Sequence, residues 1–333
     1  MEKPVKTDVV IIGAGPVGLF AVFECGMLGL KCHVVDSLPE IGGQCTALYP
    51  EKPIYDIPGF PSIDAGTLIE NLEKQAAPFN PQYHLGVTVS GLTKTNCGWK
   101  VITSSNTTIE CSAVIIAAGA GAFGPNRPPL DGIEAFENKS VFYMVKRRDD
   151  FKDKIVMIAG GGDSAIDWAN SLSEVASKIY LVHRRDKFRA APDSIEKMNS
   201  NPKIEKIIPA QLHSLAGKNG AIESVTLSDL EGEKITLRVD CLLPFFGLAA
   251  SLGPIAEWGL NVENHVIPVN QQTAQTAQAG IYAVGDIAAY PHKLKLILTG
   301  FAESAQAAHH IWHQLHPNQE LHQEYSTTKG IPN

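Results

Sequence analysis

Two glycine-rich segments combine the residue types and the spacing that bind the phosphates of a dinucleotide. Residues 8–18 read DVVIIGAGPVG and residues 155–165 read IVMIAGGGDSA. Both match G-x-G-x-x-G/A, with Gly13, Gly15 and Gly18 in the first segment and Gly160, Gly162 and Ala165 in the second. In this pattern the first glycine makes a tight turn, the second lets the backbone approach a pyrophosphate, and the third position lets helix and strand pack closely. We interpret the pair as two dinucleotide sites; the alternative is two structural turns without a ligand.

The two segments differ in the residues at the end of the second strand of each unit. Counting 23 positions from the leading glycine reaches Asp36 in the first segment and His183 in the second, where Arg184 and Arg185 follow. A carboxylate accepts hydrogen bonds from ribose hydroxyls but repels a 2′-phosphate, whereas guanidinium groups attract that phosphate. The first site is therefore predicted to bind a dinucleotide without a 2′-phosphate, and the second to bind NADP(H). The alternative for the arginines is a solvated charged face or the start of a helix.

The elements that must position these residues form two β–turn–α–β units, which begin 147 positions apart. In the first unit, a helix is predicted over residues 19–29 and a strand over residues 32–36. In the second unit, a helix is predicted over residues 166–177 and a strand over residues 178–182. Strands that alternate with helices indicate an α/β fold with parallel sheets.

Composition limits the other function classes. The chain has 333 residues, enough for two domains, and its net charge of -7 argues against nucleic acid as a partner. The longest apolar runs end in Gly or Pro, and the N-terminal residues contain no apolar signal region, so we expect no membrane segment and a cytoplasmic protein. The six cysteines form neither a CxxC pair nor a zinc-like spacing, so we expect no metal and no disulfide framework.

Several motifs together resemble the two-dinucleotide flavoprotein reductases of the thioredoxin reductase type. They are GAGPVGL, IGGQ at 41–44, GGGDSA, HRRDKFRA at 183–190 and GIYAVGDI at 280–287. The resemblance implies that the first unit binds FAD and the second the pyridine nucleotide. It also implies that Asp286 reaches the ribityl chain of the flavin, that the following helix begins near the isoalloxazine ring, and that Arg189 assists with NADP(H).

One departure from that family places the chain in a subclass. Dithiol reductases carry a CxxC shortly before the second glycine turn, but residues 140–154 contain no cysteine. The chain resembles the branch without the dithiol, the thioredoxin-reductase-like ferredoxin/flavodoxin–NADP⁺ reductases. The motifs of that branch imply further FAD contacts from Gln44, Tyr49, Val89 and Phe123, and from Tyr325, Ser326 and Thr327 in a C-terminal tail.

The resulting fold prediction is α/β, with two Rossmann-like dinucleotide-binding domains and the NADP(H) domain inserted into a discontinuous FAD domain. We expect the FAD-binding domain to comprise residues 1–119 and residues 249–333, the latter including the C-terminal tail. The NADP(H)-binding domain is expected to comprise residues 120–248.

The resemblance implies an FAD-dependent oxidoreductase that transfers electrons between NADP(H) and ferredoxin or flavodoxin, by hydride exchange between NADPH and flavin and one-electron steps to the carrier. No catalytic side chain is required, because the cofactor performs the chemistry. The resemblance also implies a homodimer. Two alternatives stay open, a protein-disulfide reductase without its own dithiol and a FAD/NADP(H)-binding sensor with little turnover. The sequence leaves open the carrier and the direction of electron flow.

Three smaller features each have two interpretations. His309 and His313 could chelate a metal or belong to a solvated helix end. Cys45 could be redox-active or could pack as a small hydrophobe. The basic run KRRDD at 146–150 could dock an acidic partner or form an exposed linker.

Overall fold

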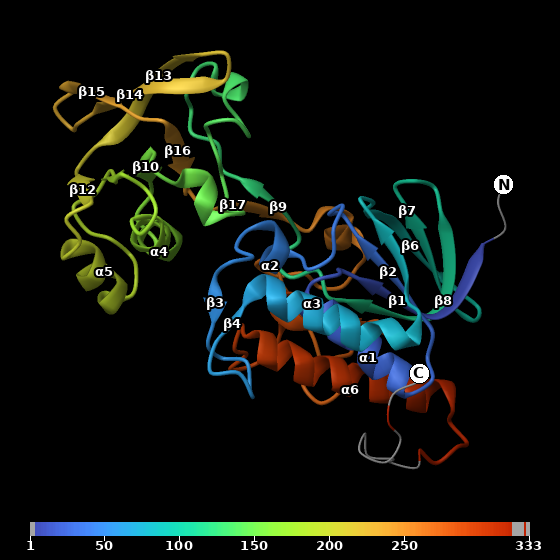
Figure 1. Ribbon diagram of the computed structural model, residues 1–333. Helices are drawn as coiled ribbons and strands as arrows, with labels where there is room; N and C mark the ends of the chain where they lie inside the picture. Colours follow the sequence, from blue (N-terminus) through green and yellow to red (C-terminus); the bar gives the residue numbers. More distant parts are fainter. Residues whose placement is uncertain (1–3, 322–329, 331–333) are drawn as a thin grey trace. The chain divides into compact units, whose positions relative to one another are not determined.

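The chain divides into two compact units. The structure, a computed structural model, describes residues 4–321 and residue 330 (Figure 1). The discontinuous unit comprises Met1–Phe123 and Ala250–Asn333, and the inserted unit comprises Gly124–Ala249. Two short strands lie where the chain passes from one unit to the other, β9 (Ala122–Pro125) and β17 (Leu248–Ser251).

A seven-stranded sheet forms the centre of the discontinuous unit. Its order is β5-β2-β1-β8-β7-β6, with β19 paired to β8. Strands β5, β2, β1, β8 and β19 are parallel, and β6, β7 and β8 pair antiparallel. The strands are β1 (Val5–Ile12), β2 (Cys32–Asp36), β5 (Gln82–Leu85), β6 (Val89–Thr95), β7 (Gly98–Thr103), β8 (Thr108–Ile116) and β19 (Ile281–Ala283).

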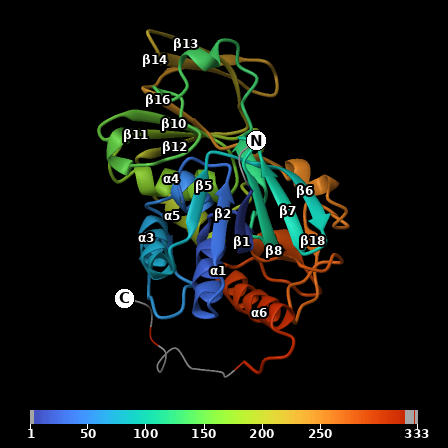
Figure 2. The same ribbon diagram turned by 90° about the vertical axis from the view of Figure 1, so that its right-hand side faces the viewer.

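Both faces of this sheet are buried, because side chains alternate along each strand. On β1, Val9 and Ile11 pack with helices α1 and α6, whereas Val10 and Ile12 pack on the opposite face with Trp99 of β7 and with residues that follow β17. Figures 1 and 2 show α1 between α3 and α6. The helices are α1 (Pro16–Met27), α2 (Gln44–Ala47), α3 (Ala65–Ala76) and α6 (Ile297–Leu315).

Two pairs of shorter strands complete this unit. Strands β3 (Pro53–Ile54) and β4 (Ile63–Asp64) form a small antiparallel ribbon, and β18 (Ile267–Pro268) pairs with β20 (Ala288–Ala289).

The inserted unit contains a parallel sheet and an antiparallel sheet. The parallel sheet has the order β12-β11-β10-β16 and the antiparallel sheet the order β13-β14-β15. Met157 and Ala159 of β10 share a core with Val225 and Leu227 of β14, so the two sheets bury a common interior. The elements are β10 (Ile155–Ala159), α4 (Asp163–Leu172), β11 (Lys178–Val182), α5 (Pro192–Asn199), β12 (Ile204–Ile207), β13 (Gln211–Lys218), β14 (Ala221–Ser228), β15 (Lys234–Arg238) and β16 (Cys241–Pro244).

The two helices after the glycine turns begin three residues earlier than the sequence pattern predicts. Helix α1 begins at Pro16 rather than residue 19, and α4 begins at Asp163 rather than residue 166. The second glycine of each motif is the N-cap residue, and proline at the first helical position is already close to helical φ. The helix N-termini therefore lie directly at the glycine turns. The predicted strands 32–36 and 178–182 coincide with β2 and β11.

Candidate functional site

The first and third glycines of the N-terminal motif are required by the fold itself. Gly13 has a φ of +111°, and a Cβ atom there would lie 2.3 Å from the carbonyl oxygen of Ala117. A Cβ atom at Gly18 would lie 1.9 Å from the carbonyl oxygen of Gly13. These glycines let β1, β8 and α1 approach one another, so they do not by themselves indicate a ligand.

The second glycine of each motif is not required to be glycine by the packing around it. Gly15 has a φ of -71° and Gly162 a φ of -98°, which any residue adopts. A Cβ atom would lie 4.0 Å from Gly43 Cα at the first position and 3.9 Å from the Arg189 carbonyl oxygen at the second. The free space lies at a helix N-terminus, where unpaired N–H groups favour an anion. Both positions therefore fit the close approach of a dinucleotide phosphate.

Asp36 lies at the C-terminal end of β2, beside the first glycine turn. One carboxylate oxygen accepts a hydrogen bond from the N–H of Ala14 at 2.6 Å, and the other accepts one from the N–H of Leu38 at 2.8 Å. Burial raises the pKa of Asp36, and the two backbone N–H groups oppose that shift. Because a carboxylate oxygen has a second lone pair, each can also accept from a sugar hydroxyl.

A single cleft of about 1340 Å³, counting the space open to solvent, connects these features within the discontinuous unit. The predicted residues that line it are Gly13, Gly15, Asp36, Gln44, Tyr49, Val89 and Asp286. Gly18 does not line it, since it faces the turn beneath α1. The Phe123 side chain and residues Tyr325, Ser326 and Thr327 lie outside the described part of the chain.

Two walls of the cleft were not predicted as sites from residue patterns alone. Residues 251–255 follow the return of the chain from the inserted unit, and they line the cleft although they lie more than 230 residues after the glycine turn in sequence. Leu296 and Ile297, at the start of α6, line the cleft together with the Gly285–Asp286 turn. The resemblance had placed this helix start near the flavin.

Cys45 also lines the cleft, but its surroundings favour a packing role over redox chemistry. Its side chain is buried, and its Sγ atom lies 3.9 Å from the Tyr49 hydroxyl. Burial raises the pKa of the Cys45 thiol, which disfavours the nucleophilic thiolate. All six cysteines of the chain are free thiols in the structure.

The second candidate site lies in the inserted unit, where the segment after β11 returns to the glycine turn. The N–H of Arg189 donates to the carbonyl of Gly161 at 2.6 Å. The ring of His183 stacks on Phe188, and it occupies the position that a Cβ atom of Gly161 would need, 2.4 Å away. This backbone pairing fixes residues 183–189 beside the N-terminus of α4.

The basic side chains of that segment are available for a ligand. Arg184, Arg185 and Arg189 are exposed, and within residues 4–321 none of them has a carboxylate oxygen within 4.0 Å. Burial, and then the charges of Arg184 and Arg185, lower the pKa of His183. Unpaired guanidinium groups beside a helix N-terminus fit a phosphate ester.

Among the residues that the structure describes, no group of three or more His, Cys, Asp or Glu side chains could hold a metal ion. Burial, followed by the charge of His313, lowers the pKa of His309. None of the described helices has the length and apolar character that crossing a membrane requires.

Comparison with known proteins agrees with this geometry. A ferredoxin–NADP reductase of Rhodospirillum rubrum is 60% identical over 99% of this chain and 98% of its own length. Reductases of the same name from Paramagnetospirillum magneticum and Gluconobacter oxydans are 56% and 54% identical, over 98% and 99% of this chain and 98% of each relative.

Solved thioredoxin reductases share the fold. The enzyme of Lactococcus lactis superposes with a TM-score of 0.76 at 25% identity, over 92% of this chain and 98% of its own. That of T. acidophilum gives a TM-score of 0.77 at 24% identity, over 93% and 99%. The predicted fold class is thereby confirmed.

The family assignment follows from a match to the family model for pyridine nucleotide-disulphide oxidoreductases over residues 7–311. That match spans both glycine turns and the Gly285–Asp286 turn, and it confirms FAD and NADP(H) as the cofactors. The chain belongs to the pyridine nucleotide-disulphide oxidoreductase family.

Proposed function

We propose that this protein is an FAD-dependent oxidoreductase that transfers electrons between NADP(H) and ferredoxin or flavodoxin. The observation that carries the proposal is the presence of two glycine turns with open second glycines, one followed by Asp36 and the other by Arg184 and Arg185. The curated relatives named ferredoxin–NADP reductase support the same activity.

In the discontinuous unit, the N-terminus of α1 and Gly15 bind the pyrophosphate of FAD, and Asp36 accepts hydrogen bonds from its ribose. Asp286 reaches the ribityl chain, while Gln44 and Tyr49 contact the flavin and Val89 the adenine end. Bound FAD supplies the conversion between two-electron hydride chemistry and one-electron transfer. Residues 251–255 and Leu296 provide largely apolar walls against which the cofactor can pack.

In the inserted unit, Gly162 and the N-terminus of α4 bind the pyrophosphate of NADP(H). Arg184 and Arg185 bind the 2′-phosphate, and Arg189 adds to the same positive field. Asp163, at the start of α4, accepts a hydrogen bond from the N–H of Ala191 at 3.0 Å and so ties the segment after the arginines to this helix.

A disulfide relay within the chain receives no support from the cysteines. Cys25 and Cys32 lie close enough for their side chains to hydrogen bond, but both are buried in the core between α1 and the sheet. The bond to Cys25 and burial raise the pKa of the Cys32 thiol well above its usual range. Buried thiols with such pKa values are inert in disulfide exchange, so direct transfer from the flavin to a protein carrier is favoured.

The experiment is NADPH-driven reduction of ferredoxin, flavodoxin and thioredoxin in parallel with purified protein, and the reverse reaction with reduced ferredoxin and NADP⁺. We expect rapid turnover with ferredoxin or flavodoxin. Turnover with thioredoxin alone would favour the disulfide reductase, and bound cofactors with no turnover would favour the sensor. The comparison of forward and reverse rates reports the preferred direction.

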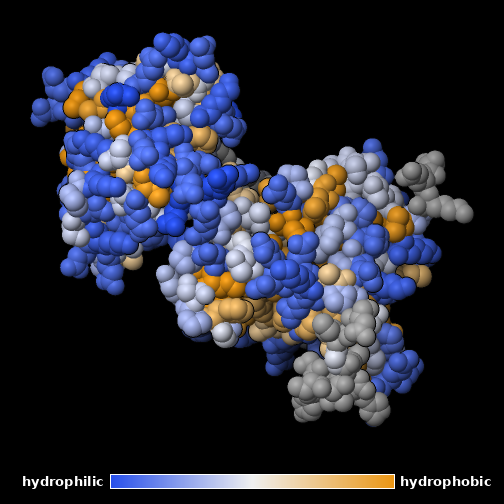
Figure 3. All heavy atoms as spheres, viewed as in Figure 1, coloured by the Kyte–Doolittle hydropathy of each residue, from blue (hydrophilic) through white to orange (hydrophobic). Residues whose placement is uncertain are grey.

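We further propose a homodimer in the cytoplasm. Large apolar side chains near β3, β4 and the start of α6 are exposed, including Tyr55 (71%), Phe60 (42%) and Leu298 (42%). Figure 3 shows apolar surface over the part of this unit where Figure 1 places β3 and β4. Six free thiols are typical of a reducing compartment. Sedimentation equilibrium should give twice the chain mass, and Phe60→Ser should weaken association; a monomer at micromolar concentration would contradict the dimer.

A further inference from the structure

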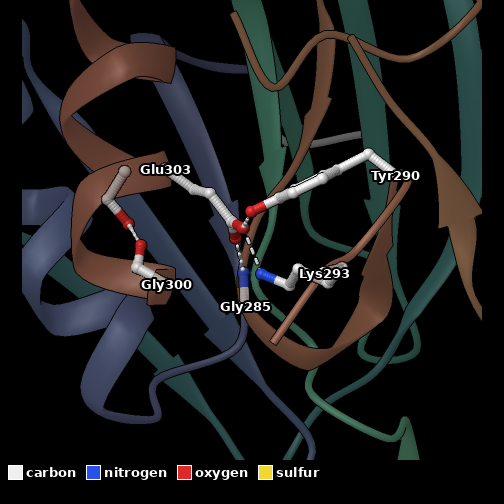
Figure 4. Close-up of polar contacts among 6 residues, drawn as sticks. Gly285, Tyr290, Lys293, Gly300 and Glu303 are labelled. Atoms are coloured by element: carbon white, nitrogen blue, oxygen red, sulfur yellow. Dashed lines mark hydrogen bonds and ion pairs between the residues drawn. The ribbon is translucent and has the colours of Figure 1, made fainter. Parts of the chain in front are cut away.

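A buried carboxylate in α6 holds the turn that precedes Asp286. Glu303 is 3% exposed, and one of its oxygens accepts a hydrogen bond from the N–H of Gly285 at 2.7 Å. The other oxygen accepts a hydrogen bond from the Tyr290 hydroxyl at 2.7 Å and pairs with the ammonium group of Lys293. Figure 4 shows the three donors converging on this carboxylate.

The two charged side chains of the cluster are nearly inaccessible to water, so they depend on one another. The side chains of Lys293 and Glu303 are 6% and 4% exposed. A buried ion pair gains little stability over an apolar pair of the same shape, but removal of one partner leaves an uncompensated charge and is strongly destabilising. Stability alone therefore gives no reason for an ion pair at this place.

The cluster connects two walls of the FAD cleft. Gly285 has a φ of +75° and lines the cleft with Asp286, so the donor to Glu303 is the backbone group directly before the ribityl contact. Lys293 belongs to the loop that leads to Leu296 and Ile297, which line the cleft at the start of α6. One carboxylate thus fixes both the turn and the loop.

Close packing leaves this arrangement little freedom. Gly300 lies one helical turn before Glu303, and a Cβ atom on it would lie 2.4 Å from a methyl group of Val17 and 3.2 Å from the Cα atom of Gly285. The helix therefore rests directly on the Gly285 turn, and a small rotation of the turn would displace Asp286 from the cleft.

We propose that Glu303 is a positioning residue of the FAD site. It acts through the Gly285 N–H to hold Asp286 at the ribityl chain, and Lys293 and Tyr290 keep its carboxylate in place and neutralise its charge. Glu303 does not touch the cofactor. The inference rests on the proposed function, because it requires FAD in this cleft.

The test compares two variants that both remove the buried charges. In Glu303→Gln/Lys293→Met, the amide oxygen can still accept from Gly285 while the amide group donates to the Tyr290 oxygen. In Glu303→Leu/Lys293→Met, no acceptor remains for Gly285. The measurement is the rate at which FAD leaves the holoprotein on dilution, followed by the rise in flavin fluorescence.

We expect the leucine variant to release FAD at least about tenfold faster than the wild type, the scale of one lost buried hydrogen bond. The glutamine variant should stay within about threefold of the wild type. Adding Asp286→Asn should accelerate release in the glutamine background but add little in the leucine background, because Glu303 acts through Asp286.

A matched control is Tyr282→Phe, which removes a partly buried hydrogen bond of 2.8 Å to His310 of α6 outside the cleft. It should lower the melting temperature without changing FAD release. Equal release from the leucine and glutamine variants, additive effects with Asp286→Asn, or an equal effect of Tyr282→Phe would overturn the inference. A wild type without FAD would instead overturn the proposed function, and this inference with it.

Discussion

Arg184 and Arg185 have no carboxylate partner within the described residues, so a bound 2′-phosphate would be the first anion to pair with them. They follow β11 with only His183 between, their side chains are exposed, and within the described residues they form no ion pair. Asp36 ends β2 in the other unit, where it is buried and accepts two backbone hydrogen bonds. The end of the second strand thus carries a carboxylate acceptor for hydroxyls in one unit and is followed closely by exposed cations in the other.

Single substitutions Arg184→Ala and Arg185→Ala should each raise the KM for NADPH about 10- to 100-fold, the scale of a charge-assisted hydrogen bond. The KM for NADH should change little, since NADH lacks the 2′-phosphate. Steady-state kinetics with both coenzymes provides the measurement. Arg238→Ala, an exposed cation on β15, is the control and should affect neither coenzyme. Equal losses for NADPH and NADH would refute the assignment of the arginines.

At the scale of elements, each proposed phosphate site consists of a strand, a glycine turn and the first turn of a helix. In the glycine turn of the inserted unit, the requirement of close packing and the space for a ligand fall on different glycines. Gly160 must be glycine for packing, since a Cβ atom there would lie 2.6 Å from the Phe245 carbonyl oxygen. Gly162 has free space and ordinary backbone angles.

Gly160→Ala should therefore lower the free energy of unfolding by about 1–3 kcal/mol, as overpacking does. Gly162→Ala should leave the unfolding free energy within about 0.5 kcal/mol of the wild type. Because its methyl group would occupy the phosphate position, Gly162→Ala should raise the KM for both NADPH and NADH at least about tenfold. Urea unfolding without coenzyme and steady-state kinetics measure the two effects. A Gly162→Ala protein with unchanged KM values would argue against a phosphate at this turn.

At the scale of the whole molecule, half-buried histidines in both units connect stability to pH. Burial is the largest cause of a lowered pKa at His33, His84, His183, His309 and His310. His33 and His84 also share a hydrogen bond of 2.9 Å between ring nitrogens, which requires that at least one of them is neutral. Protonation of these rings is thus less favourable in the folded protein than in the unfolded chain.

The lowered histidine pKa values make the folded protein less stable as the pH falls. Below the ordinary histidine pKa of about 6.5, the unfolded chain binds more protons than the folded protein, so the free energy of unfolding falls as pH falls. We expect a lower melting temperature at pH 5.5 than at pH 7.5. Below about pH 5 the raised pKa values of Glu24 and Asp36 act in the opposite direction. His84→Gln should reduce the pH dependence; a melting temperature that rises on acidification to pH 5.5 would contradict this account.

The sequence by itself determined the features that depend on spacing along the chain. These features are the two glycine turns, strands β2 and β11, and the contrast between Asp36 and Arg184. Within each unit they lie within about 25 residues of the leading glycine, where local geometry dominates. The absence of cysteine from residues 140–154 likewise needed no structure.

Only the tertiary structure decided which glycines are required by close packing and which leave space for a ligand. It also brought residues 251–255 to the cleft and placed Glu303 on the Gly285 N–H. These contacts join segments that are distant in the chain or face each other only when α6 packs on the sheet. Their cause is the close packing of a folded interior, which no pattern of neighbouring residues specifies.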